Sequence, residues 1–198
     1  MQGRSHGLRA CVALGLPMVL TVIVSGCSSQ VPAPTSYTAF TSKDGAFRIQ
    51  YPEGWKAESG SRPDNTYSWA RFTQGPAAVR VIADVSGSLM ADVSRAFGGD
   101  DDDEFPPVLA AHESKTRIIA DDFGDYHEGK SILIDTAMGK SCVCEFEANG
   151  SMGVRLRGYR VTMLSRDRRI TVLTYCPLKQ WNRLKPAFEE VFLSVGRG

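Results

Sequence analysis

The chain has 198 residues, of which 42% are apolar and 23% charged, with 23 basic and 22 acidic side chains. This composition excludes an intrinsically disordered chain and supplies enough apolar surface for one folded core. A near-neutral charge gives no general attraction to a phosphate backbone, so we expect no nucleic acid among the partners.

The first 26 residues have the organisation of an export signal. Arg4 and Arg9 precede an apolar run over residues 10–25, which is shorter than the about 20 residues needed to span a bilayer. The run ends in the letters VSGC, whose cysteine is Cys27, and this resembles a bacterial lipobox. The resemblance implies cleavage before Cys27, acylation of Cys27, and a place in the bacterial cell envelope, anchored to a membrane. An ordinary cleaved signal peptide and an uncleaved anchor helix remain the alternatives.

Residues 27–36 are expected to form the acylated cysteine and a flexible tether. The stretch after Cys27 lacks apolar periodicity and contains Pro32 and Pro34, which favour an extended conformation. At about 3.3 Å per residue it reaches roughly 30 Å at most. We therefore expect a domain over residues 37–198 that tumbles freely near the membrane.

Alternating polarity predicts strands at both ends of this domain. Phe47, Ile49 and Tyr51, for example, alternate with polar residues and indicate a half-buried strand. Asp167-Arg168 is expected to form the turn between the last two strands. Strands are expected over residues 37–42, 47–51, 67–73, 78–85, 131–136, 142–148, 159–166 and 170–176.

The middle of the domain changes to helical spacing. One helix is expected over residues 89–97 and a second from Pro106, while a third begins after Pro177 and should be kinked or restarted by Pro186. The order of strands, helices, strands and helix implies an α+β fold with a mainly antiparallel sheet. The second helix is expected to bury Val108, Leu109, His112 and Ile119.

Both ends of the domain resemble the PsbP-like family. Residues 47–55 read F-x-I-x-Y-P-x-G-W, and residues 158–195 combine a Gly-Tyr strand, an Asp-Arg-Arg turn, the letters LTYCP and a closing helix. The family includes the extrinsic photosystem II protein, a nuclear-import factor that binds a Ran-type GTPase, and many bacterial lipoproteins. The resemblance implies a central antiparallel sheet with helices on both faces, but no single function.

Three cysteines follow Cys27. Cys142 and Cys144 lie on one face of a strand and could hold a soft metal ion, although the apolar residues that continue this face favour a buried core. The expected strand order separates Cys176 from both by two strands, so we predict three free, mostly buried thiols. The expected register places Ser165 opposite Ile170, Val161 opposite Thr174, Cys144 near Val161, and Phe146 near Tyr159.

The acidic run at residues 100–104 is the strongest charge cluster. It lacks the ordered glycine turn and distal glutamate of a calcium loop, so a solvated loop is the favoured interpretation. A second acidic group, Asp121, Asp122 and Asp125, could approach it.

The mature chain keeps two histidines and three tryptophans. We expect His112 to lie in the core or at its boundary and His127 in a polar loop, and neither belongs to a recognisable catalytic motif. Trp55, Trp69 and Trp181 are expected in the core or at its edge.

These observations predict a lipid-anchored, non-catalytic binding or assembly module with no cofactor and no resident metal. Acyl chains on Cys27 would hold it to the membrane, and its partner would be an unidentified protein. One alternative is an envelope metal-binding protein that uses residues 100–104 or Cys142 and Cys144. Another is a hydrolase whose site lies in residues 87–125.

Overall fold

The computed structural model describes residues 30–85, 107–165 and 168–198. Cys27, the expected helix over residues 89–97 and the acidic run at 100–104 lie outside these residues. The centre of the fold is an eight-stranded antiparallel sheet in the order β3-β4-β5-β10-β9-β8-β6, with β7 also paired to β8. Its strands are β3 (Lys56–Ser61), β4 (Tyr67–Gln74), β5 (Ala77–Asp84), β6 (Gly124–Glu128), β7 (Ile132–Thr136), β8 (Gly139–Asn149), β9 (Arg155–Leu164) and β10 (Arg169–Pro177).

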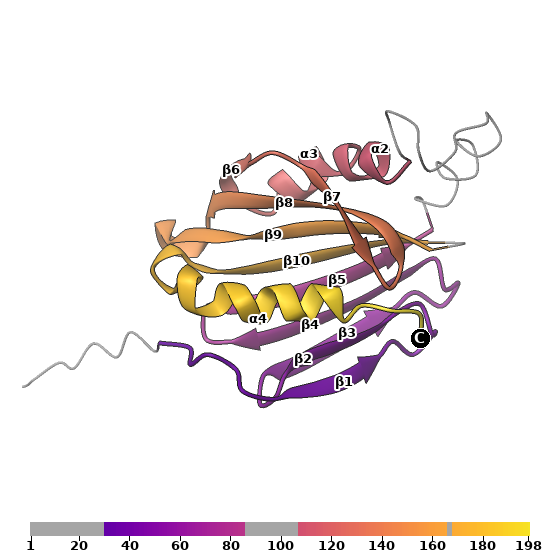
Figure 1. Cartoon of the computed structure of the whole chain (residues 1–198), viewed down its shortest axis with the longest axis horizontal. Helices are drawn as coiled ribbons and strands as arrows, with labels where there is room; N and C mark the ends of the chain where they lie inside the picture. The colour runs from indigo at the N-terminus through magenta and orange to yellow at the C-terminus, as the bar shows by residue number, and fades with distance from the viewer. Residues whose placement is uncertain (1–29, 86–106, 166–167) are drawn as a thin grey trace, which may run out of the picture.

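Further elements cover both faces of this sheet (Figure 1). On one face lie α4 (Trp181–Leu193), which follows the short helix η2 (Leu178–Gln180), and the hairpin of β1 (Tyr37–Thr41) and β2 (Arg48–Pro52). On the other face, α2 (Pro107–Glu113) and α3 (Thr116–Ala120) lie at the β8 and β9 end. The expected α+β class, with helices on both faces of an antiparallel sheet, is confirmed.

The larger core lies between α4, the β1–β2 hairpin and the sheet. Successive side chains of a strand point to opposite faces of the sheet, and this alternation directs apolar residues into the core. Val79 and Val81 of β5 are fully buried in this core, while Arg80 and Ile82 point to the opposite face. A smaller apolar cluster lies under α3 on that opposite face, and its buried members are Ile119, Phe146, Ala148 and Leu173.

Two strands were not predicted from the sequence. β3 reads KAESGS and is almost wholly exposed, so its apolar pattern is absent and only its pairing with β4 makes it a strand. β6 contains His127, which was expected in a loop, and it pairs with the second half of β8.

The expected second helix is divided into α2 and α3. The Ser114 hydroxyl donates to the carbonyl of Ala111, and the Arg160 guanidinium donates to the carbonyl of His112 at 2.7 Å, so these groups end α2. Val108, His112 and Ile119 are buried as predicted, whereas Leu109 is only half-buried. α4 continues through Pro186 as one helix and is not restarted there.

The predicted registers of the last three strands are wrong. The β9–β10 hairpin pairs Leu164 with Arg169, and Ser165 N–H donates to the Arg168 carbonyl at 2.7 Å, so Arg168, which was expected in the turn, lies opposite Ser165. The β9–β10 pairing differs from the prediction by two residues, which leaves each side chain on its expected face. The β8–β9 pairing differs by one residue, and because both faces are covered here, burial alone does not select between the two registers. The observed pairs are Val161 with Val172, Ile170 with Met163, Cys144 with Arg160, and Phe146 with Gly158.

The expected state of the thiols is confirmed: Cys142, Cys144 and Cys176 are free and buried. β9 separates the strands that carry them, as predicted. Cys176 also belongs to the core beneath α4, whereas Cys144 faces the other side of the sheet. Cys144 and Cys176 therefore cannot form a disulfide. A disulfide requires Cα atoms within about 7 Å and side chains that point toward each other.

The segment that precedes β1 lies against the domain where it is described. Val31 is only 2% exposed, and its N–H donates to the Gln180 side chain at 3.4 Å. Arg183 of α4 donates to the Gln30 side chain at 3.1 Å. At Gln30 and Val31 this segment therefore contacts the domain, whereas the sequence predicts a flexible tether there. Within the described residues no helix is long and apolar enough to cross a bilayer.

Candidate functional site: an arginine-containing groove and a buried polar cluster

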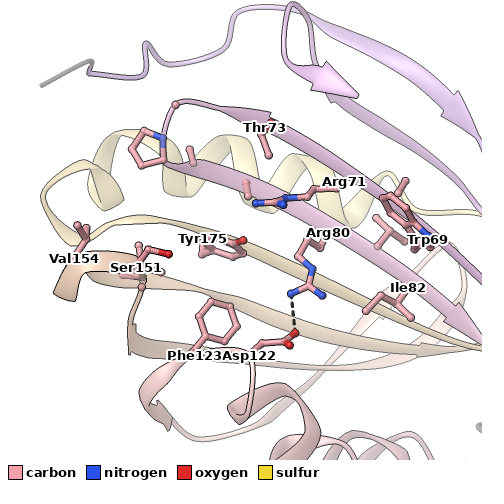
Figure 2. Close-up of a pocket in the computed structure, with 18 of the residues that line it drawn as sticks. Trp69, Arg71, Thr73, Arg80, Ile82, Asp122, Phe123, Ser151, Val154 and Tyr175 are labelled. Carbon is pink, nitrogen blue, oxygen red and sulfur yellow. Dashed lines mark hydrogen bonds and ion pairs between the residues drawn. The ribbon is translucent and has the colours of Figure 1, made fainter. Parts of the chain in front are cut away.

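A groove of about 740 Å³ lies on the sheet face opposite α4, where β4 and β5 extend beyond α3 (Figure 2). Its floor is formed by the side chains that alternation directs away from the main core. On β4 these are Tyr67, Trp69, Arg71 and Thr73, and on β5 they include Arg80 and Ile82.

Two arginines lie side by side on this floor. Arg71 of β4 and Arg80 of β5 are direct cross-strand partners (Figure 2). Arg80 donates to the Asp122 carboxylate at 2.8 Å. In the described part of the chain no hydrogen bond or ion pair joins Arg71 to a carboxylate, although Glu58 lies opposite it on β3. Glu58 itself forms an ion pair with Lys56 at 2.6 Å.

Aromatic side chains form the far wall of the groove. Phe123, just after α3, packs edge-on against Tyr175 of β10 with ring centroids 5.4 Å apart. One end of the groove is closed by the loop η1 (Ser151–Gly153), where Met152 takes a left-handed conformation with φ 57°. Met152 is 98% exposed, so the loop presents an apolar side chain to solvent beside the groove.

A second notable site, which we call the Arg160 cluster, lies beneath α2, and its central side chain, Arg160, is closed to solvent. Arg160 of β9 is 0% exposed and donates to both carboxylate oxygens of Glu128, at 2.5 and 2.6 Å. Arg160 also donates to the Thr116 hydroxyl at 2.8 Å and to the His112 carbonyl. Tyr126 donates its hydroxyl proton to Glu128 at 2.5 Å. The buried charges are thus paired and well bonded, as charges in a protein interior must be.

The pKa values in this cluster follow from that pairing. Burial alone would raise the pKa of Glu128, but hydrogen bonds from Arg160 and Tyr126 lower it below its usual value. Burial lowers the pKa of His112 to about 4, and the nearby Arg160 charge acts in the same direction. His112 is therefore neutral at physiological pH, and its Nδ1 lies 2.9 Å from the Thr162 hydroxyl. Among the described residues, no group forms a hydrogen bond with its Nε2.

The Arg160 cluster brings three potential metal ligands together. Ligand atoms of His112, Glu128 and Cys144 lie within 4.8 Å of one another. The donor set nevertheless does not fit a metal ion in this arrangement, because Arg160 occupies both oxygens of the carboxylate and would repel a cation. Burial also raises the pKa of Cys144 to about 12, which opposes the thiolate that a metal needs. The sequence singled out Cys144 but not its association with His112 and Glu128.

The groups that a hydrolase would need are not accessible at this cluster. His112 and Thr162 form a base–hydroxyl pair, but both side chains are 0% exposed and no substrate can reach them. His127 is exposed and contacts Asp125 at 2.9 Å, at a shallow hollow of about 330 Å³ along the β6 edge. Much of residues 87–125, where the hydrolase alternative placed its site, lies outside the described residues.

The groove itself was missed by sequence reasoning. Trp55 and Trp181 are buried as predicted, but Trp69 is half-buried on the groove floor. The available signal was the polar face of β4, on which Trp69 and Arg71 alternate with buried Ala70 and Phe72. Asp122, expected in an acidic cluster, instead forms an ion pair with Arg80, whose strand is distant in sequence.

Comparison with known proteins identifies the type of fold. No protein-family model matches the sequence, and no curated protein matches it. The solution structure of cyanobacterial PsbP (CyanoP) from Synechocystis is similar, with a TM-score of 0.59 at 14% identity, and the match covers 88% of this chain and 99% of that one. The fold is therefore PsbP-like, as the sequence resemblance predicted, and at this identity the likeness concerns the fold alone.

Two further solved structures are more distant. PA94 from Pseudomonas aeruginosa, a protein of unknown function described as a putative regulator, has a TM-score of 0.40 at 12% identity, covering 77% of this chain and 91% of that one. A protein from Bacteroides thetaiotaomicron has a TM-score of 0.48 at 10% identity, covering 81% and 48%. Neither likeness is close enough to support a functional argument.

Proposed function

We propose that this protein is a lipid-anchored, non-catalytic PsbP-like module that binds a protein partner at a membrane of the bacterial envelope. The groove over β4 and β5 is the observation that supports this function. It combines Trp69, Tyr175 and two arginines, which are the residue types that dominate binding energy at protein interfaces. The exposed Met152 beside it adds an apolar contact of the kind that marks such surfaces.

The position of the N-terminal segment supports a partner close to the membrane. Gln30 contacts Arg183 near the beginning of α4, and Cys27 precedes Gln30 by only three residues. At 3.8 Å between consecutive Cα atoms, the Cα atom of an acylated Cys27 would lie within about 11 Å of the Cα atom of Gln30. β10 ends at Pro177, immediately before η2 and α4, so the Tyr175 end of the groove lies at the same end of the sheet.

The anchor is tested by replacing Cys27 with Ser. Without a thiol at this position no acyl chain can be attached, and the stable anchoring that requires more than one chain is lost. We expect the wild-type protein to partition into the detergent phase of envelope extracts and Cys27→Ser to be unprocessed or to remain in the aqueous phase. Processing at the same point and unchanged detergent partition in Cys27→Ser would contradict lipidation.

Binding through the groove is tested by site-specific photocrosslinking in the intact envelope. A photoreactive phenylalanine replaces Thr73, which is half-buried in the groove. The matched control carries the same group at Asn182, which is exposed on α4 at the opposite face. We expect one defined protein adduct from position 73 and none of that mass from position 182. Identical adducts from both positions, or none from position 73, would show that the groove is not the binding surface.

A further inference from the structure

The groove carries positive charge that its own residues leave incompletely balanced. Arg71 and Arg80 lie directly opposite each other, an arrangement that destabilises a sheet when nothing neutralises it. Asp122 forms an ion pair with Arg80 alone. Glu58, on the far side of Arg71, is bound to Lys56, so its charge is shared between two cations. An anionic group between the two guanidinium groups would relieve the repulsion and satisfy their free donors.

The groove extends on both sides of the two arginines and is lined there by aromatic and apolar side chains. Tyr67 and Thr73 mark the ends of the β4 floor and are about 20 Å apart along the strand, which matches about six residues of extended chain. Trp69 and Tyr175 flank the arginines and offer aromatic surface (Figure 2). β4 and β5 are interior strands with both edges paired, so recognition here must use side chains and cannot add a strand.

We propose that the groove binds an extended acidic segment of the partner protein, with a carboxylate held between Arg71 and Arg80 and apolar or aromatic side chains against Trp69 and Tyr175. This inference rests on the proposed binding function and adds the chemistry of the partner. A phosphate or a lipid headgroup would supply the charge, but it would leave most of the apolar and aromatic surface along the groove uncovered.

The probe is a fluorescein-labelled decapeptide of alternating Glu and Tyr, compared with one of alternating Gln and Tyr. Binding to the purified full chain in detergent is followed by fluorescence anisotropy at low and high salt. We expect the Glu–Tyr peptide to bind at least about tenfold more tightly, because its carboxylates make charge-assisted hydrogen bonds with arginine. Added salt should weaken its binding, since the groove is open to solvent.

Three groove variants and one control locate the binding site. Arg71→Gln should weaken binding of the Glu–Tyr peptide by about tenfold or more. Asp122→Asn should strengthen it, because this change frees Arg80 from its own counterion. Arg183→Gln, on α4 at the opposite face, should leave affinity unchanged. Thermal melting confirms that each variant is folded, and loss of the tryptophan fluorescence response in Trp69→Phe places the peptide on the groove floor.

Several outcomes would overturn the inference. Equal affinity for the two peptides, or Arg71→Gln binding as the wild type does, excludes acidic recognition by this groove. If crosslinking from position 73 captures a partner and Arg71→Gln leaves that capture unchanged, the binding function stands and its acidic specificity is wrong. If phosphatidylglycerol vesicles bind in an Arg71-dependent manner and the Glu–Tyr peptide does not, the occupant is a lipid headgroup and the proposal also fails.

Discussion

Replacing Glu128 with Gln is expected to lower the free energy of unfolding by about 3–5 kcal/mol, the usual cost of removing one partner from a buried ion pair. Arg160 is 0% exposed and is bound through both oxygens of Glu128, so the variant leaves its charge buried without a counterion. Urea unfolding followed by far-ultraviolet circular dichroism measures the change.

An exposed ion pair provides the matched control. Glu147 accepts from Arg155 at 2.8 Å on the surface of the same sheet, so Glu147→Gln should cost less than about 1 kcal/mol. Replacing both Arg160 and Glu128 with apolar residues, as in Arg160→Met with Glu128→Leu, should recover stability relative to Glu128→Gln. If Glu128→Gln is no more destabilised than Glu147→Gln, the Arg160 pair is not the buried, charge-paired unit described above.

Mild acid is expected to destabilise the domain through His112. Its folded pKa is about 4, whereas an unfolded chain titrates near 6.5, so only the unfolded state binds this proton between those values. The contribution is fully present above pH 6.5 and is lost as the pH falls toward 4. Its size is about 3 kcal/mol for a shift of this magnitude. The charged groups that face His112 are Arg160 and Glu128, and the pKa of Glu128 lies below its usual value, so the decline down to about pH 5 reports His112.

The measurement is the free energy of unfolding at pH 7, 6 and 5 for the wild type and His112→Gln. The glutamine retains a polar group for the Thr162 hydroxyl but has no titrating proton, so its stability should vary less with pH over this range. An unaltered pH slope in His112→Gln would mean that other groups cause the acid sensitivity.

Local patterns in the sequence predicted the framework of the fold. The alternation of Phe47, Ile49 and Tyr51 and the apolar spacing after Pro177 located a strand and a helix that the structure contains. The strand order that separates Cys176 from Cys144 was also predicted correctly, and the thiols are free. These features could be predicted because burial of one side of an element leaves a period in the residues of that element alone.

Elements and sites that depend on neighbours could not be predicted in this way. β3 and β6 lack apolar alternation and exist because β4 and β8 supply their hydrogen bonds. The β8–β9 register was predicted wrongly because both strands are covered on both faces, so that a one-residue shift still buries apolar side chains. His112 was placed near the core correctly, yet its association with Glu128 depends on how α2 packs against the sheet.

By itself, the sequence determined the α+β class, the strand over residues 47–51, the closing helix and the separation of the thiols, because each depends on periodicity or chain order within single elements. Only the tertiary structure decided the groove, where β4 and β5 bring Arg71 and Arg80 together and Asp122 joins them from the end of α3. It also decided the pairing of Arg160 with Glu128. The physical reason is that ion pairs and grooves form between residues that are distant in sequence. The local sequence pattern around each residue does not identify the partner that it contacts in the folded chain.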